Sequence, residues 1–206
     1  MKFVKMPKAP KMIVATLSDV QIRLLLAAID QKNPLGYRDY CMLLILLDTG
    51  VRLSELVNLK IDDIDLERGQ FKVMGKGWKE RIVPFGANVQ RVLWRYVHQY
   101  RPKPFHPGIK NAFHTGDDQP MTATWFYRRV VACGHSAGLE GVRCSPHTFR
   151  HTFAKKFLLN GGDLFTLQKI LGHTTLEMVR NYVNLASADV TAIHRRFSPM
   201  DLMPQK

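Results

Sequence analysis

Apolar residues recur at three- and four-residue spacing along most of the chain, which is the pattern of amphipathic helices. Capping residues mark several boundaries: Ser18 and Gln21 form a capping box, Ser145 precedes a proline, and Gly50 follows an apolar run. The predicted helices cover residues 18–30, 37–49, 53–59, 87–101, 122–136, 145–161, 163–172 and 188–197, with a further helix that starts at 174 and contains 182.

Between residues 61 and 85 the apolar spacing changes to alternate positions, which is typical of half-buried strands. Three short strands are predicted, over 61–66, 71–74 and 81–85, and a Pro-rich loop follows at 102–120. We therefore expect a mainly α chain with a small three-stranded antiparallel β-sheet, an α+β fold. Its expected organisation is a basic linker at 1–12, one compact domain over 13–197 and a tail at 198–206.

The charge balance narrows the classes of function. With 206 residues, 46% of them hydrophobic, the chain has the composition of a globular protein of one or two domains. It carries 30 Lys and Arg against 17 Asp and Glu, a net charge of +13, which favours binding to a polyanion, with nucleic acid as the first candidate. A basic enzyme or a ribosome-associated protein is the alternative that charge alone leaves open.

The cysteines and the N-terminus indicate a cytoplasmic protein. The 3 cysteines are odd in number and widely spaced, so neither a disulfide framework nor a zinc site is expected. The first residues lack the continuous apolar stretch of a signal peptide. The longest apolar run, 41–47, is far shorter than the ~20 residues that span a membrane, so we expect no membrane association.

A histidine and an arginine lie at a predicted helix start. His147 and Arg150 are three residues apart, on one face of the first turn after Pro146. The backbone N–H groups of a first turn lack intrahelical partners and the helix dipole is positive there, so the two side chains would suit a phosphate. The alternative is an ordinary surface histidine and arginine.

Arg52 and Lys76 are weaker candidates for contacts to the same anion. Gly50 permits a sharp turn that would aim Arg52 inward, although an arginine in a loop is more often solvated or paired with a carboxylate such as Glu55. Lys76 lies between two glycines at a predicted hairpin tip, where exposed lysines are common.

His173 and Tyr182 are the remaining candidates. His173 follows Gly172 at a predicted helix end, and Tyr182 lies on the next helix, where a tyrosine is commonly a half-buried packing residue. The segment 167–182 is also compatible with a helix-turn-helix, which would belong to a DNA-binding regulator.

Metal and nucleotide chemistry find little support in the sequence. His147 and His151 are spaced i, i+4, but the glutamate that a metalloprotease helix needs is missing and Arg150 would repel a cation. The glycines at 75 and 77 lack the spacing of a nucleotide-binding P-loop. We therefore expect neither a metal nor another cofactor.

Taken in order, five blocks resemble the tyrosine recombinase/integrase family of phages and mobile elements. The blocks are TGVRLSEL (49–56), GKGWKERIVPF (75–85), HTFRHTFA (147–154), LGH (171–173) and NYVNL (181–185), and the resemblance spans residues 14–197. It implies the catalytic-domain fold of that family and site-specific DNA strand exchange. Matching residue by residue implies six catalytic residues: Arg52, Lys76, His147, Arg150, His173 and Tyr182.

The resemblance also implies a role for each residue. Tyr182 would attack a DNA phosphodiester to leave a 3′-phosphotyrosine and a free 5′-hydroxyl, while the two guanidinium groups contact the non-bridging oxygens. His147 would accept the phenolic proton, Lys76 would protonate the departing 5′ oxygen, and His173 would donate a hydrogen bond to the phosphate. One phosphoester replaces another, so rejoining would need neither ATP nor metal.

Members of the family usually carry an N-terminal core-binding domain, which we expect to be absent because Lys2–Lys11 resembles the linker that would follow it.

Double-stranded DNA is the expected partner, bound weakly and with a steep salt dependence. A homo-oligomer, a tetramer on DNA, is expected of the full-length enzyme, with a monomer as the alternative for this fragment. The expected location is cytoplasmic and nucleoid-associated. The alternative functions are type IB topoisomerase-like relaxation of DNA and the non-catalytic regulator.

Overall fold

The computed structural model describes residues 15–75, 77, 79–104, 106, 108–117, 119–183, 194, 198, 200, 201 and 203. Its helices are α1 (Asp19–Ala27), α2 (Pro34–Thr49), α3 (Leu53–Val57), α4 (Ala87–Arg95), α5 (Ala123–Ser136), α6 (Pro146–Leu159), α7 (Leu164–Leu171) and α8 (Glu177–Val183). Its strands are β1 (Ile64–Asp65), β2 (Gln70–Met74) and β3 (Glu80–Pro84). The predicted linker at 1–12 lies outside the described residues, as does nearly all of the helix predicted over 188–197.

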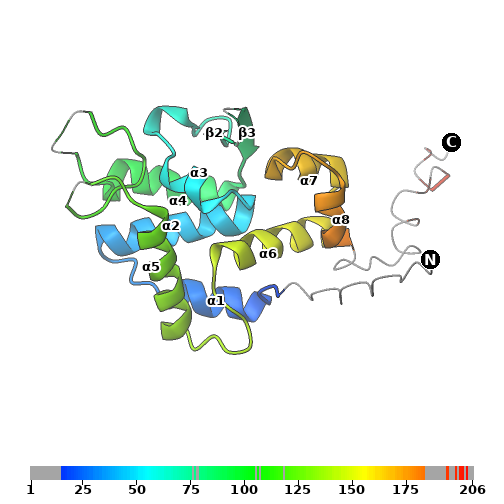
Figure 1. The fold of residues 1–206 in the computed structure, drawn as a ribbon, viewed down its shortest axis with the longest axis horizontal. Helices are drawn as coiled ribbons and strands as arrows, with labels where there is room; N and C mark the ends of the chain where they lie inside the picture. The colour runs from blue at the N-terminus through cyan, green and yellow to red at the C-terminus, as the bar shows by residue number, and fades with distance from the viewer. Residues whose placement is uncertain are drawn as a thin grey trace, which may run out of the picture.

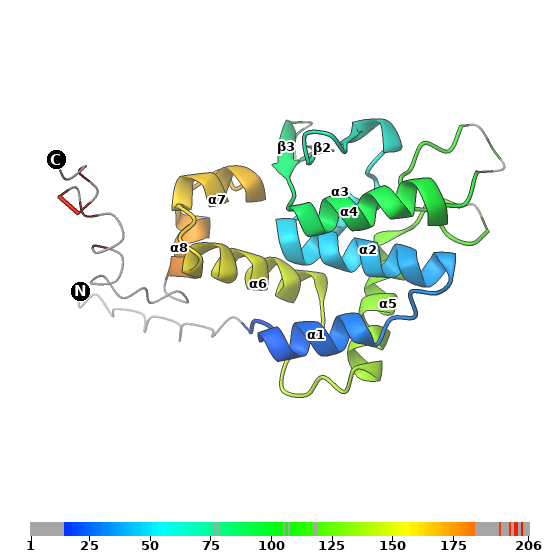
Figure 2. The same ribbon diagram turned by 180° about the vertical axis from the view of Figure 1, so that it is seen from behind.

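α2 is the central helix of the fold and packs against α3, α4 and α6. In Figures 1 and 2 the sheet lies above α2 and α1 lies below it, while α7 and α8 gather at one end of α6. The strands pair antiparallel in the order β1-β2-β3, with Phe71 opposite Val83 and both side chains buried. The predicted α+β class, mainly helical with one small antiparallel sheet, is confirmed.

Helix ends that the sequence marks are found where they were expected. Ser18 and Gln21 form the capping box of α1, and the Ser145 hydroxyl accepts from the backbone N–H of Thr148 at the start of α6. Gly50 ends α2 with φ +61° and Gly172 ends α7 with φ +65°. Both glycines adopt the left-handed conformation that closes a helix, which L side chains adopt only with strain.

Several boundaries differ from the prediction, among them the following three. α2 begins at Pro34 and not at Tyr37, because the Asn33 side chain caps it by accepting from the N–H of Gly36. The segment Ile61–Asp63 is a 3₁₀ turn, so the first strand is shorter than predicted. α8 begins at Glu177, three residues after the cap predicted at Thr174.

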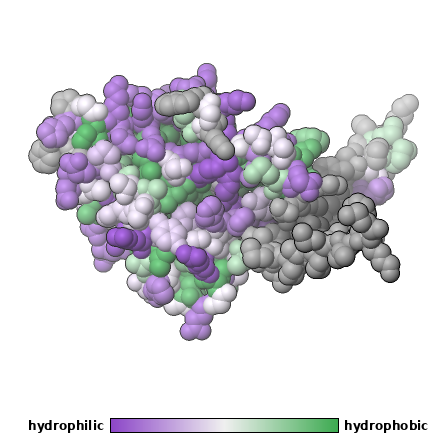
Figure 3. Space-filling view, viewed as in Figure 1, coloured by the Kyte–Doolittle hydropathy of each residue, from purple (hydrophilic) through white to green (hydrophobic). Residues whose placement is uncertain are grey.

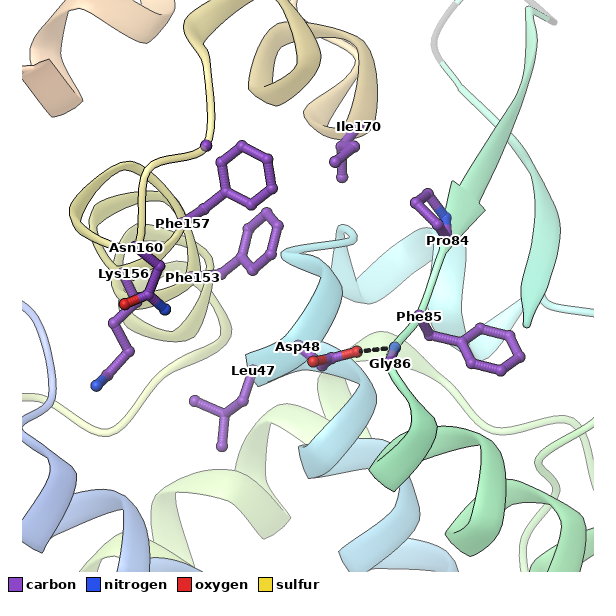
Figure 4. Close-up of a pocket in the computed structure, with 11 residues that line it drawn as sticks. Leu47, Asp48, Pro84, Phe85, Gly86, Phe153, Lys156, Phe157, Asn160 and Ile170 are labelled. Carbon is purple, nitrogen blue, oxygen red and sulfur yellow. Dashed lines mark hydrogen bonds between the residues drawn. The ribbon is translucent and has the colours of Figure 1, made fainter. Parts of the chain in front are cut away.

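The phenylalanine row of α6 joins this helix to the core. Phe149 and Phe153 are buried, and Phe157 is partly buried against them. Figure 4 shows Phe153 and Phe157 beside Ile170 of α7, across a pocket of about 490 Å³ that also borders the start of α4. This packing fixes α6 relative to α7, and it therefore orients the polar residues that α6 carries on its other faces.

The face drawn in Figure 3 is mainly hydrophilic, with hydrophobic side chains scattered between charged ones. Within the described part of the chain, no helix combines the length and the apolar character that crossing a membrane requires.

Candidate active site

A pocket of about 420 Å³ forms where the turn after α2, the first half of α6, the loop after α7 and α8 come together. Five of the six predicted catalytic residues line this pocket: Arg52, His147, Arg150, His173 and Tyr182. The sixth, Lys76, lies outside the described residues. The predicted residues come from four separate segments, so the fold brings together side chains that are up to 130 positions apart (182 − 52).

Arg150 is buried and is held by two helix ends. Its Nη1 donates to the carbonyl of Gly50 at 2.7 Å, and its Nη2 donates to the carbonyl of Leu171 at 2.8 Å. Carbonyls at the C-terminal end of a helix lack intrahelical partners and carry partial negative charge, which suits a guanidinium. Burial, and next the Arg52 charge, lower the pKa of Arg150 to about 10, so the group stays cationic at neutral pH.

Arg52 is the N-cap residue of α3 and is oriented by Glu55. The buried carboxylate accepts from the Arg52 backbone N–H at 2.9 Å and from its Nη1 at 3.0 Å. The Arg52 side chain remains 38% exposed on the pocket wall, where it can meet a ligand. The carboxylate pairing considered from the sequence is thus present, and it fixes Arg52 without removing it from the pocket.

Arg81 completes this network and was missed from the sequence. Its Nη1 and Nη2 donate to the two oxygens of Glu55 at 2.7 and 2.8 Å, and its Nε donates to the carbonyl of Ile170 at 2.9 Å. One signal was available: along β3, Arg81 shares a face with the buried Val83, where an unpaired charge would be costly.

His173 is neutral and contacts Arg150. Its Nε2 lies 3.1 Å from Nη2 of Arg150. Because a guanidinium only donates, Nε2 must accept and the ring proton lies on Nδ1. Burial, followed by the charges of Arg150 and Arg52, lowers the pKa of His173 to about 4, which agrees with a neutral ring.

Tyr182 lies on α8 and is 4% exposed. Its hydroxyl is 3.0 Å from Nδ1 of His151, a residue that the sequence analysis considered only as a metal ligand. Burial raises the pKa of Tyr182, and the positive charges of Arg150 and Arg52 act against that rise. The phenol is therefore protonated at neutral pH and needs an acceptor for its proton before it can attack.

His147 is exposed in the first turn of α6 and lines the same pocket. The helix N-terminus there favours an anion beside the two arginines. A second pocket of about 630 Å³ adjoins the first, since Arg52 and His173 line both. Gly75 and Lys79, the described residues on either side of Lys76 and Trp78, also line this second pocket.

The side chains of the site differ from those of a metal centre. Among the residues that the structure describes, no three His, Cys, Asp or Glu side chains are grouped so that they could hold a metal ion. The donor set of the pocket is instead cationic and imidazole-rich, which suits an anionic ligand.

A family model and a similar sequence both indicate the same protein family. Residues 15–189 match the model of the phage integrase family. The tyrosine recombinase XerD of Listeria innocua is 36% identical over 200 residues, which are 95% of this chain and 66% of that protein. The chain therefore spans just under two thirds of the length of this relative.

Solved structures give the same result. The structure of the XerA recombinase superposes with a TM-score of 0.74 at 27% identity, covering 98% of this chain and 68% of that one. The Tn1549 transposon integrase, in complex with circular intermediate DNA, superposes with a TM-score of 0.70 at 27% identity, covering 94% of this chain and 68% of that one.

Proposed function

This chain belongs to the phage integrase family, the tyrosine recombinases, and we propose that it is the catalytic domain of a site-specific DNA recombinase. One observation carries the proposal: Arg52, Arg150, His173 and Tyr182 line one pocket together with His147. The relatives named above are recombinases and an integrase, which favours strand exchange over topoisomerase-like relaxation or a regulator without catalysis.

The scissile phosphate is proposed to bind between the two guanidinium groups and the start of α6. Each arginine offers donors in a fork that matches two phosphate oxygens, and attack on phosphorus increases the negative charge on those oxygens. Preorganised donors of this kind supply about 3–4 kcal/mol each when they meet charge that develops in the transition state. Arg52 is anchored by Glu55, and Arg150 by two carbonyls, so both are preorganised.

Tyr182 is proposed as the nucleophile. Its oxygen forms a bond to phosphorus while the bond to the 5′ oxygen breaks, which leaves a 3′-phosphotyrosine and a free 5′-hydroxyl. Lys76 is proposed to protonate the 5′ oxygen, and His147 to contact the same anion or take the phenolic proton. His173 is proposed to donate to the phosphate from Nε2, which requires that the phosphate replace Nε2 as the acceptor of Arg150 and that the ring proton move from Nδ1 to Nε2. One phosphoester bond forms for each one that breaks, so little bond energy is lost and rejoining needs no ATP.

We propose double-stranded DNA as the partner, in line with the +13 charge and with the DNA present in the Tn1549 integrase structure. We also propose a cytoplasmic, nucleoid-associated location, where such a DNA substrate would be met. Exchange between two duplexes requires four strand cleavages, so the proposed assembly of the full-length enzyme is a tetramer.

Trapping of a covalent protein–DNA adduct tests this function. The probe is a library of duplexes with randomised sequence around a nick, because the short fragment released after cleavage diffuses away and leaves the adduct stranded. We expect the wild-type protein to become linked to DNA under denaturing electrophoresis and Tyr182→Phe to remain unlinked. An adduct of equal yield with Tyr182→Phe would remove Tyr182 as the nucleophile.

A further inference from the structure

Three imidazole rings line the pocket, and one of them contacts the reacting atom. His151 lies one helical turn after His147 on α6, and its Nδ1 is 3.0 Å from the hydroxyl oxygen of Tyr182. The centroids of the His151 and Tyr182 rings are 5.4 Å apart. His173 is farther from the phenol, with a centroid distance of 6.5 Å, and its Nε2 already accepts from Arg150.

The surroundings of His151 and Tyr182 favour a neutral imidazole beside a protonated phenol. Burial, and then the proximity of His147 and Arg150, lower the pKa of His151, so its ring is neutral at neutral pH. The pKa of Tyr182 is raised, chiefly by burial, so its oxygen keeps the proton. A protonated phenol can donate to Nδ1 of a neutral ring, and this direction requires the ring proton of His151 to lie on Nε2.

We propose that His151 is a catalytic residue that accepts the phenolic proton of Tyr182, an assignment that rests on the function proposed above. During cleavage the Tyr182 oxygen bonds to phosphorus, its proton moves to Nδ1 of His151, and the bond to the 5′ oxygen breaks as that oxygen takes a proton from Lys76. Rejoining reverses each transfer: the 5′-hydroxyl attacks, and His151 returns its proton to the departing phenol. His147, in the exposed first turn, is thereby left to contact the phosphate.

The groups that face His151 favour its neutral form, which is the form that can accept a proton. They are His147 and Arg150 from α6, Tyr182 from α8, His173 from the loop after α7, and Arg52 from the wall opposite. Two of these groups are permanent cations and none is a carboxylate. A bound phosphate adds the negative charge that stabilises the imidazolium once it forms, so proton acceptance is favoured when DNA is present.

The rate of adduct formation in a single turnover, measured against pH with a duplex selected from the nicked library, tests the assignment. His151→Asn keeps an acceptor near the phenol but cannot take a proton at neutral pH. We expect this variant to be slower by about 10²- to 10⁴-fold and to lose the fall in rate that the wild type shows as acid protonates His151. His135→Asn, an exposed histidine on α5, is the matched control and should keep the wild-type rate.

The outcomes separate this inference from the proposed function. A wild-type rate and an unchanged pH profile in His151→Asn, with the Tyr182 adduct intact, would overturn the role of His151 and leave the recombinase assignment standing. No adduct with the wild-type protein would overturn both. Nitrogen NMR of the wild-type imidazoles provides a test that needs no variant, because the proposal requires the proton of His151 on Nε2; a proton on Nδ1 would overturn it.

Discussion

Arg81 and Glu55 form a bidentate ion pair that joins β3 to α3, with both N–O distances below 3 Å. The same carboxylate holds Arg52, and the same guanidinium reaches the carbonyl of Ile170, two residues before the loop that carries His173. One ion pair therefore sets the positions of two candidate catalytic residues that lie on different segments.

Replacing Arg81 should destabilise the fold. Arg81→Ala removes two donors from a carboxylate whose side chain is 4% exposed. Removing one partner of a buried pair costs about 3–5 kcal/mol, and we expect a value near the lower end because Arg81 is not fully buried. Urea unfolding provides the measurement. Arg68→Ala is the control, since Arg68 is 78% exposed and pairs with Asp65 at 3.7 Å, a contact worth at most about 1 kcal/mol. Equal losses in the two variants would contradict the account.

The Glu55 network also makes stability depend on pH in the acid range. Burial raises the pKa of Glu55, but the hydrogen bonds and charges of Arg81 and Arg52 outweigh it, so the folded-state pKa lies below the ordinary 4.5. The carboxylate therefore contributes its full stabilisation above pH 4.5 and loses it as the pH falls through the lowered pKa. The free energy of unfolding of wild type should exceed that of Glu55→Gln at neutral pH, and the gap should narrow on acidification. A difference in unfolding free energy that widens in acid would contradict the lowered pKa of Glu55 in the folded protein.

Gly50 combines a left-handed backbone with a tight contact. It has φ +61°, and an added Cβ would lie 2.5 Å from a ring carbon of Phe153. Gly138 has φ +62° with nothing within 4 Å, so it shares the strain without the contact. We expect Gly50→Ala to lose about 2–4 kcal/mol of unfolding free energy and Gly138→Ala about 1 kcal/mol, measured by thermal unfolding. Similar losses would mean that Phe153 moves aside freely.

Arg150→Lys tests whether the fork geometry matters beyond the charge. Lysine keeps a cation but cannot bond two carbonyls and still present planar donors to a phosphate. We expect the rate of adduct formation to fall by about 10²- to 10³-fold, the usual effect of losing one preorganised donor. Arg91→Lys, on the exposed side of α4, should keep the wild-type rate. A wild-type rate in Arg150→Lys would argue that charge alone suffices.

Local signals in the sequence predicted most helix ends, because a cap is a contact between residues three or four positions apart. Ser18, Gly50, Ser145 and Gly172 all act where they were expected. The 3₁₀ turn at Ile61–Asp63 was missed, since alternating apolar residues over a few positions do not separate it from a strand.

The site was predictable only in part, for a physical reason. The family pattern supplied the residues that line the pocket, but the partners that orient them are distant in the chain. Arg81 is 26 positions from Glu55, and His151 is 31 positions from Tyr182. His151 follows His147 by one turn, a spacing that was weighed as a metal site and rejected, so the sequence pattern assigned His151 no role before the fold placed a tyrosine beside it.

The central claim is that Tyr182 is the nucleophile, and locating the attachment point of DNA tests it most directly. The trapped adduct of the wild-type protein is treated with nuclease and trypsin, and the modified peptide is identified by mass spectrometry. Trypsin cuts after Arg180 and Arg195, so the account predicts a nucleotide on the peptide 181–195, in which Tyr182 is the sole tyrosine. A nucleotide on any other peptide would contradict it.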